Sequence, residues 1–353
     1  MTPVVPGFIL APAGPWATDE VELMKRSRPL LLLPLLLVAL CLPDSANAKV
    51  VVQRITYHGW SDALLMSNAT VSVVIVPAIG RVMQFGFSGE EGAFWENRAL
   101  DGREVDSQVI AWAAKEWVNF GGDKTWPSPE ANWSAFTGRK GWRPPPAFDG
   151  IPSEATVSGD SVVLTTTVDP FYGVRAVRRV ELHSSRAEMK ITTTYERVEG
   201  EPANIGIWVI TQLKEPEGVF APVPRKSMFK EGYIPLGQTA PPSLKMTNGF
   251  VSLTRNARAA HKIGLDGDSL LWVGPKHALR IDSSRERRGL YPDKGSSTEI
   301  YTNPDPLPYV ELEMLGPVQL MKKGDKIQRS NRYTLTRRTQ PTPEAEARHL
   351  FGK

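Results

Sequence analysis

The sequence has very little of several features that would define a protein class at once. Its 353 residues include a single cysteine, Cys41, which excludes a disulfide framework and a zinc site built on cysteine ligands. It has no phosphate-cradling glycine loop and no HExxH motif, and its formal net charge is only +4. The longest apolar run covers 13 residues, at 30–42, whereas a membrane-spanning helix needs about 20. These absences exclude a polytopic membrane protein and give no sign of a metal or an organic cofactor.

Turn-forming and apolar residues, by contrast, are well represented. The chain contains 29 glycines and 30 prolines, and 41% of its residues are hydrophobic against 23% charged. This composition is that of a soluble globular protein with many turns, so we expect many short strands rather than a helical bundle. The mixed-charge run at 284–288 is too short to indicate a nucleic-acid partner.

The first 48 residues have the organisation of a secretory signal. Three basic residues precede the apolar run and a small-residue cleavage pattern follows it, namely Lys25, Arg26, Arg28 and Ala46-Asn47-Ala48. We predict that residues 1–48 are an upstream extension and signal peptide, with translation starting at Met1 or Met24. The mature chain would begin near Lys49 and be periplasmic or secreted in a bacterium, without stable membrane insertion. An uncleaved anchor is the alternative.

Beyond residue 49, short runs rich in Val, Ile, Thr and Tyr alternate with clusters of Gly, Pro, Asn and Asp. Period-2 alternation of this kind is typical of half-buried strands. It predicts strands at 70–76, 161–168, 174–182, 188–197, 204–213, 269–273 and 308–314. We therefore predict a single all-β domain over 49–338, a large antiparallel β-sandwich. A polar, frayed C-terminal tail at 339–353 would follow it, and the only helix expected before the tail is a short one at 110–117.

The segment from Trp112 to Trp142 contains five of the ten tryptophans. It is also rich in Gly and Pro, so we predict a rigid, irregular loop, and long loops in a compact domain are usually functional. Aromatic rings between fixed polar groups suit sugars, because the C–H face of a pyranose packs on a ring while polar side chains bond its hydroxyls. The candidate residues are Trp126, Trp133, Trp142, Asn119, Asp123 and Lys124. The alternative is a small core beneath a long loop.

Two glutamates on one predicted strand are the best candidates for chemistry. In PYVELEMLG, at 308–316, side chains alternate with period 2, so Glu311 and Glu313 share one face with Tyr309. The other face consists of Val310, Leu312 and Met314. Because the apolar face can pack in the core, the glutamates face either solvent or a polar cleft. They would lie about 7 Å apart, and each would raise the pKa of the other.

Several segments taken together resemble the galactose mutarotase-like proteins. VPAIGRVMQFGFSGEEGAFWEN, at 76–97, is similar to the opening of that family, where an early strand passes through a Gly-Arg turn. The stretch at 173–182, followed by MKITTTYERVEGEPANIGIW, resembles its central hairpin and returning strand. GGDKTWPSP and YVELEMLGPVQLMKKGD resemble an uncharacterised bacterial branch, a domain of unknown function within the superfamily. The resemblance implies the supersandwich fold, with a sugar site in the concave face of its twisted sheets.

The resemblance also implies roles for individual residues. In mutarotases a glutamate on a late strand is the general base that takes the anomeric hydroxyl proton; Glu311 or Glu313 matches it, and Glu313 is preferred. The family's acid is a histidine on the strand after the central hairpin, where this chain has IWVITQ at 207–212. Lys124, beside Asp123, is considered as a substitute proton donor.

Two classes of function remain open. The first is an exported carbohydrate-binding protein that holds a mono- or oligosaccharide. The second is a sugar-active enzyme, either aldose 1-epimerase-like or a lyase or hydrolase, with Glu313 or Glu311 as general base. The candidate catalytic residues are Glu313, Glu311, Asp123 and Lys124, and the candidate binding residues are Trp126, Trp133, Trp142, Arg81, Asn119 and Asn303. We expect Glu313 to share one cleft with Asp123 and Lys124, with a glutamate carboxylate within about 10 Å of Lys124.

Overall fold

The computed structural model describes residues 49–104, 117–138, 144–237 and 239–352. By its internal contacts the chain divides into two units, Met1–Asp44 and Ser45–Lys353, and every described residue belongs to the second. The predicted signal peptide, 1–48, and the short helix expected at 110–117 lie wholly or almost wholly outside the described residues. Within the described ranges, no helix combines the length and the apolar character needed to cross a membrane.

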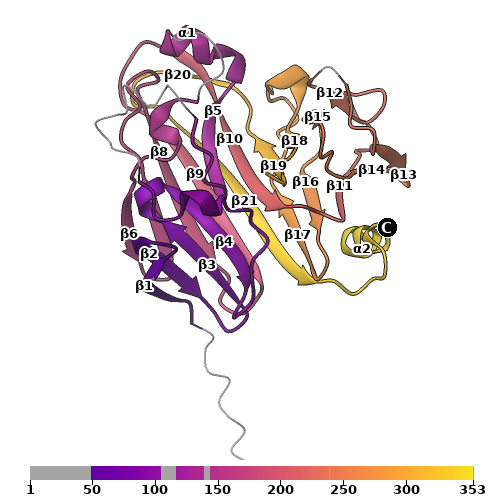
Figure 1. Ribbon diagram of the computed structural model, residues 1–353. Coiled ribbons are helices and arrows are strands. Elements are labelled where there is room, and N and C mark those ends of the chain that lie inside the picture. The colour runs from indigo at the N-terminus through magenta and orange to yellow at the C-terminus, as the bar shows by residue number, and fades with distance from the viewer. Residues whose placement is uncertain (1–48, 105–116, 139–143, 238, 353) are drawn as a thin grey trace, which may run out of the picture. The chain divides into compact units, whose positions relative to one another are not determined.

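The second unit consists mainly of two antiparallel sheets (Figure 1). The first sheet has the strand order β1-β2-β3-β4-β5-β10-β19-β18-β15-β12, and β20 pairs with β10 beyond this path. Its strands are β1 (Val51–Tyr57), β2 (Trp60–Ser67), β3 (Val71–Val76), β4 (Arg81–Phe87), β5 (Asp123–Ser128), β10 (Ala203–Lys214), β12 (Ile234–Pro235), β15 (His261–Leu265), β18 (Thr298–Thr302), β19 (Tyr309–Leu315) and β20 (Gln319–Met321).

The second sheet has the order β13-β14-β11-β16-β17-β21-β9-β8-β7-β6. Its strands are β6 (Glu154–Ser158), β7 (Ser161–Thr165), β8 (Val174–Leu182), β9 (Glu188–Arg197), β11 (Gly218–Pro222), β13 (Lys245–Thr247), β14 (Phe250–Leu253), β16 (Ser269–Val273), β17 (His277–Asp282) and β21 (Lys326–Arg337). The described residues include two α-helices, α1 (Trp133–Thr137) and α2 (Pro343–Phe351).

Side-chain alternation places one face of each sheet against the other. Along β8, for example, every second residue is buried and those between are half-buried. Apolar residues of both sheets, among them Ile75, Val180 and Leu312, form one shared core. The predicted antiparallel β-sandwich is therefore confirmed. Each of the seven predicted strands is present, with ends that differ by three residues or fewer.

The Trp-rich segment is not wholly an irregular loop as predicted. β5 lies within it and pairs with β10 over six residues, from Asp123 opposite Thr211 to Ser128 opposite Gly206. The prolines of this stretch hide the strand in the sequence, because proline cannot donate a ladder hydrogen bond and argues against a central strand.

The C-terminal residues also differ from the expected frayed tail. The side chain of Thr342 caps α2 by accepting a hydrogen bond from the Ala345 backbone N–H at 3.2 Å. The helix contacts β11 and β16, with Ala347 and Phe351 packed against their apolar residues. The segment is mostly polar, and its few apolar residues follow helical spacing. The sequence does not show the apolar surface against which they pack, so it predicts a tail.

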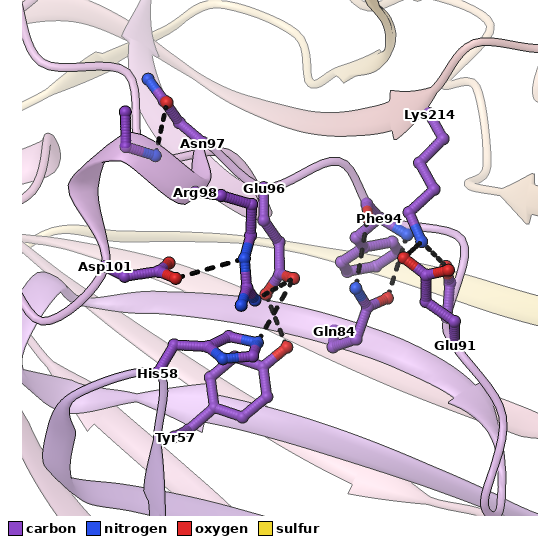
Figure 2. A network of polar contacts seen from close by, with 12 residues as sticks. Tyr57, His58, Gln84, Glu91, Phe94, Glu96, Asn97, Arg98, Asp101 and Lys214 are labelled. Carbon is purple, nitrogen blue, oxygen red and sulfur yellow. Dashed lines mark hydrogen bonds and ion pairs between the residues drawn. The ribbon is translucent and has the colours of Figure 1, made fainter.

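A polar network holds the segment between β4 and β5 against the first sheet (Figure 2). Glu96 accepts a hydrogen bond from the Tyr57 hydroxyl at 2.7 Å, and its other oxygen lies 3.8 Å from Arg98. Nearby, the Lys214 Nζ atom lies 2.6 Å from a carboxylate oxygen of Glu91. These contacts tie the segment to β1 and to the end of β10.

The same network positions an aromatic residue beneath the site described next. The side-chain amide of Gln84 donates to the C=O of Phe94 at 3.2 Å and accepts from its N–H at 3.1 Å (Figure 2). The following residue, Trp95, has its ring centroid 4.6 Å from that of Tyr309 on β19. The segment therefore supports one wall of the candidate site.

Candidate functional site

A pocket of about 370 Å³ lies over the central strands of the first sheet. Four of the residues that line it, Lys262, Tyr301, Glu311 and Glu313, belong to two cross-strand rows. Residues paired across antiparallel strands share one face of the sheet. The two rows are Lys124-Ile210-Glu313-Glu299 and Gln212-Glu311-Tyr301-Lys262. The intervening Val310 and Leu312 lie in the core between the sheets. Both rows therefore face away from the second sheet.

Aromatic rings form a large part of the pocket lining. They belong to Trp117, Trp126, Trp208, Tyr301 and Tyr309. Trp126 and Trp208 stand opposite each other on β5 and β10, with ring centroids 5.4 Å apart in an edge-to-face arrangement. The ring centroid of Trp117 lies 6.2 Å from that of Trp126. The three indoles thus form one continuous aromatic wall.

Glu313 is fully buried and takes part in a charged cluster at the pocket. Its Oε2 atom accepts a hydrogen bond from Trp208 Nε1 at 2.7 Å and lies 3.0 Å from Lys262 Nζ. The same Lys262 atom lies 2.7 Å from Glu299 Oε2. Burial acts against the charge on Lys262, but Glu299 and Glu313 outweigh it and raise the lysine pKa well above its ordinary value. Glu313 Oε1 has no hydrogen-bond partner among the described residues, so it can accept from a ligand.

Glu311 neighbours Glu313 on the same face of β19. Its Oε1 atom accepts a hydrogen bond from the side-chain amide of Gln212 at 2.8 Å. Burial raises the pKa of Glu311 to about 7; Glu313 acts in the same direction and Lys124 in the opposite one. A carboxyl group with this pKa can take up or release a proton near neutral pH, as general acid–base catalysis requires.

Lys124 is buried against the aromatic wall and is not one of the residues lining the pocket. Its Nζ atom lies 3.9 Å from the ring centroid of Trp126 and 5.0 Å from that of Trp117. Burial lowers the pKa of Lys124 to about 8, while Glu311 and Glu313 act to raise it. The structure thus brings the charge of Lys124 within electrostatic range of both glutamates but covers it with indole rings.

Asp123 points into the space between the sheets instead. It is fully buried, accepts hydrogen bonds from the hydroxyls of Thr211 and Tyr333 at 2.6 Å each, and forms an ion pair with Arg178 on β8. Successive residues of a strand face opposite sides of the sheet. Asp123 and Lys124 therefore cannot share one cleft, and the expectation that placed Asp123 beside the glutamates is wrong.

The other tryptophans and Asn303 differ in their access to the pocket. Trp126 and Asn303 line it. Trp133 is buried next to it, with its ring centroid 5.3 Å from that of Trp126 and its Nε1 donating to the Pro127 carbonyl at 2.8 Å. Trp142 lies outside the described residues. Trp133 therefore supports the wall from behind.

Arg81 and Asn119 do not line the pocket but hold the elements that do. Arg81 pairs with Asp149, whose other carboxylate oxygen accepts a hydrogen bond from Trp117 Nε1 at 2.6 Å. Arg81 also donates to the carbonyl of Gly121 at 3.0 Å, and Asn119 Oδ1 accepts from the Gly121 N–H at 3.3 Å. Both residues thus fix the turn that leads into β5.

Sequence reasoning missed Trp208, Lys262, Glu299 and Tyr301, which come from three different strands. Two of these strands could have been noticed in the sequence. Their runs, HKIGL and TEIYT, each contain a charged residue within an otherwise strand-like segment. Burying a charge is unfavourable unless it is paired. A lysine and a glutamate in two such runs therefore predict a buried pair, although not its location.

Histidine is not part of the pocket. All five histidines of the chain lie in the described ranges, and none is among the residues that line it. On β10, where the mutarotase resemblance implies a histidine, Trp208 donates its indole N–H to Glu313. Indole is a hydrogen-bond donor only. It can orient Glu313 but cannot take the place of an acid that gives up a proton.

The fold is that of the galactose mutarotase-like β-sandwiches. A galactose mutarotase-like protein from Lactobacillus casei superposes with a TM-score of 0.52 at 9% identity, over 78% of this chain and 100% of its own. A protein from Escherichia coli K12 described as a putative aldose 1-epimerase superposes with a TM-score of 0.50 at 10% identity, over 76% of this chain and 97% of its own. At such identities the likeness is one of fold.

Within that class, residues 62–277 match the family described as Domain of unknown function (DUF4380), and the chain belongs to this family. The matched part includes β5, β10 and β15, which carry Lys124, Trp208 and Lys262, and it ends before β18 and β19. No curated protein matches the sequence.

Proposed function

We propose that the pocket over β10 and β19 binds a carbohydrate. The observation that carries the proposal is the combination of a three-indole wall with buried carboxylates that keep a free acceptor, Glu313 Oε1. Indole faces match the C–H faces of a pyranose, and the carboxylates match its hydroxyls. A volume of about 370 Å³ is at the small end of ligand pockets, about 300–1,000 Å³. This size favours a monosaccharide or one terminal sugar of an oligosaccharide.

Binding is tested by screening the protein against an array of mono- and oligosaccharides and titrating the best ligand by calorimetry. We expect Trp117→Ala and Glu313→Gln each to weaken binding by roughly 1–3 kcal/mol, the range for buried contacts at binding hot spots. Trp133→Phe is the matched control, because Trp133 belongs to the same aromatic cluster without lining the pocket. Equal affinity in all three folded variants would contradict the proposal.

A second candidate function is proton transfer on the bound sugar, as in aldose 1-epimerisation. It is favoured by the pKa of about 7 for Glu311, which makes this residue, rather than Glu313, the better general base. Glu313 already accepts a hydrogen bond from Trp208 and forms an ion pair with Lys262. The exchange of α and β anomers of galactose and glucose, followed by NMR, should accelerate as the pH rises through 7. Glu311→Gln should lower the exchange to the rate measured without protein while sugar affinity is kept.

We also propose that the protein is exported and acts outside the cytoplasm. The support is the order of basic residues, leucine-rich run and Ala-Asn-Ala pattern before residue 49. Mass spectrometry of the native protein from fractionated cells should find an N-terminus near Lys49. Intact Met1 or Met24 in a cytoplasmic fraction would refute it.

A further inference from the structure

A second pocket, of about 200 Å³, lies where the loops that follow β17 and β19 meet β21. It shares no lining residue with the pocket over β10 and β19. They lie on opposite faces of β10, because Ile207 lines the second pocket, its neighbour Trp208 lines the first, and successive residues of a strand face opposite sides of the sheet. The lining is mostly polar and includes Ser284 and Glu286 from the mixed-charge run at 284–288, to which the proposed function gives no role.

Arg329 on β21 is the basic residue of this lining. It is only 8% exposed, and its Nη1 atom donates to the Ser284 carbonyl at 3.2 Å. Its Nε and Nη2 atoms are buried and have no hydrogen-bond partner within the described residues. These two N–H groups form one edge of the guanidinium, the fork that binds two oxygens of an oxyanion at once. A buried donor without a hydrogen-bond partner costs free energy, and an oxyanion bound at this edge would recover that cost.

We propose that this pocket binds an oxyanion group, phosphate or sulfate, through the Nε–Nη2 edge of Arg329. The loop beside it adds positive charge, since Arg287 and Arg288 are exposed and follow Glu286 directly. Arg285 is held in the same loop because its Nη1 atom donates to the Gly295 carbonyl at 3.2 Å and its guanidinium carbon lies 4.3 Å from the centroid of the Tyr291 ring. The proposal does not depend on carbohydrate binding, because it involves different residues.

Glu286 is the acidic residue of the lining and the natural competitor of an anion. Burial lowers the pKa of Arg329; the neighbouring Tyr291 hydroxyl and, after it, Glu286 act to raise that pKa, and Arg285 acts to lower it. A guanidinium stays charged throughout the accessible pH range. With no anion bound, Glu286 supplies the nearby counter-charge; with one bound, it repels the ligand. Its neutralisation should therefore strengthen anion binding.

The test is calorimetric titration of the whole protein with inorganic phosphate and, separately, with sulfate, at constant ionic strength held by chloride. We expect saturable binding that Arg329→Gln weakens roughly ten- to hundredfold, the effect of losing charge-assisted hydrogen bonds. Arg329→Lys should give an intermediate loss, because the charge remains and the fork does not. Glu286→Gln should bind more tightly than the parent. Arg332→Gln is the control, since this arginine lies on the same strand but pairs with Glu188 on the solvent side.

A binding experiment with lipid vesicles distinguishes a free anion from a lipid headgroup. The exposed Leu290 and Leu320 beside the loops could contact the acyl chains of such a lipid. The anion is a lipid headgroup if the protein co-sediments with phosphatidylglycerol vesicles but not with vesicles of phosphatidylcholine alone. The Arg329→Gln variant should then lose this co-sedimentation. Absence of binding to phosphate, sulfate and anionic vesicles overturns the proposal, as does unchanged binding in folded Arg329→Gln. If that variant does not fold, Arg329→Lys and Glu286→Gln decide: unchanged affinity in both overturns it.

Discussion

Glu311 and Lys124 are buried groups whose pKa values are moved toward neutrality, mainly by burial, to about 7 and about 8. The contribution of Glu311 to stability is complete below its ordinary pKa of 4.5 and is lost as the pH rises through 7. The contribution of Lys124 is complete above its ordinary pKa of 10.5 and is lost as the pH falls through 8. Both contributions are therefore smallest between about pH 7 and pH 8.

Replacing Glu311 with Gln removes one of these titrations while keeping an acceptor for the Gln212 amide. At pH 5 the free energy of unfolding should be close to that of the parent. At pH 8 the variant should be more stable than the parent by on the order of 2 kcal/mol, because the parent then buries an ionised carboxylate. Urea denaturation at the two pH values measures this, and a difference that is independent of pH would contradict the assigned shift.

At the scale of elements, period-2 alternation predicts β19 and its two faces correctly from the sequence. The same rule separates Asp123 from Lys124, but it can be applied only once β5 is recognised as a strand, and Pro127 hides it. The partners of Glu313 were beyond sequence reasoning for a different reason. Trp208 and Lys262 meet it through strand pairings set by the topology of the whole sheet, which no local pattern contains.

β5 depends on a close backbone approach at its entrance, which gives a prediction. Gly122 has φ of 73°, and a Cβ atom there would lie 2.5 Å from the Val82 carbonyl oxygen. Gly122→Ala should therefore cost more than the roughly 1–3 kcal/mol of an unfavourable backbone conformation alone. Gly89→Ala is the matched control, with φ of 78° and open space around the added atom. Equal losses in the unfolding free energy of the two variants would show that the close approach is relieved at no cost.

At the scale of the whole second unit, the ion pair of Asp123 and Arg178 links the two sheets through their interior. Asp123→Asn leaves Arg178 buried without a counter-charge and should cost about 3–5 kcal/mol in unfolding free energy. Glu196→Gln is the control, because it breaks two solvent-accessible pairs on the same sheet, with Arg175 and with Lys326, and should cost about 1 kcal/mol or less. Chemical denaturation compares the two. Because Asp123 faces away from the pocket, the folded variant should keep its affinity for any sugar the parent binds.

The opposite orientations of Asp123 and Lys124 have a consequence for how the sheet reaches its correct alignment. A slip of β5 by one residue along β10 would turn every side chain to the other face. Lys124 would then meet Arg178 inside the sandwich, and Asp123 would join Glu311 and Glu313 in the aromatic pocket. Both new contacts would set like charges together in a poorly solvated place. Two adjacent residues of opposite charge thus make the misaligned sheet electrostatically unfavourable on both faces, in a strand where Pro127 cannot donate a ladder hydrogen bond.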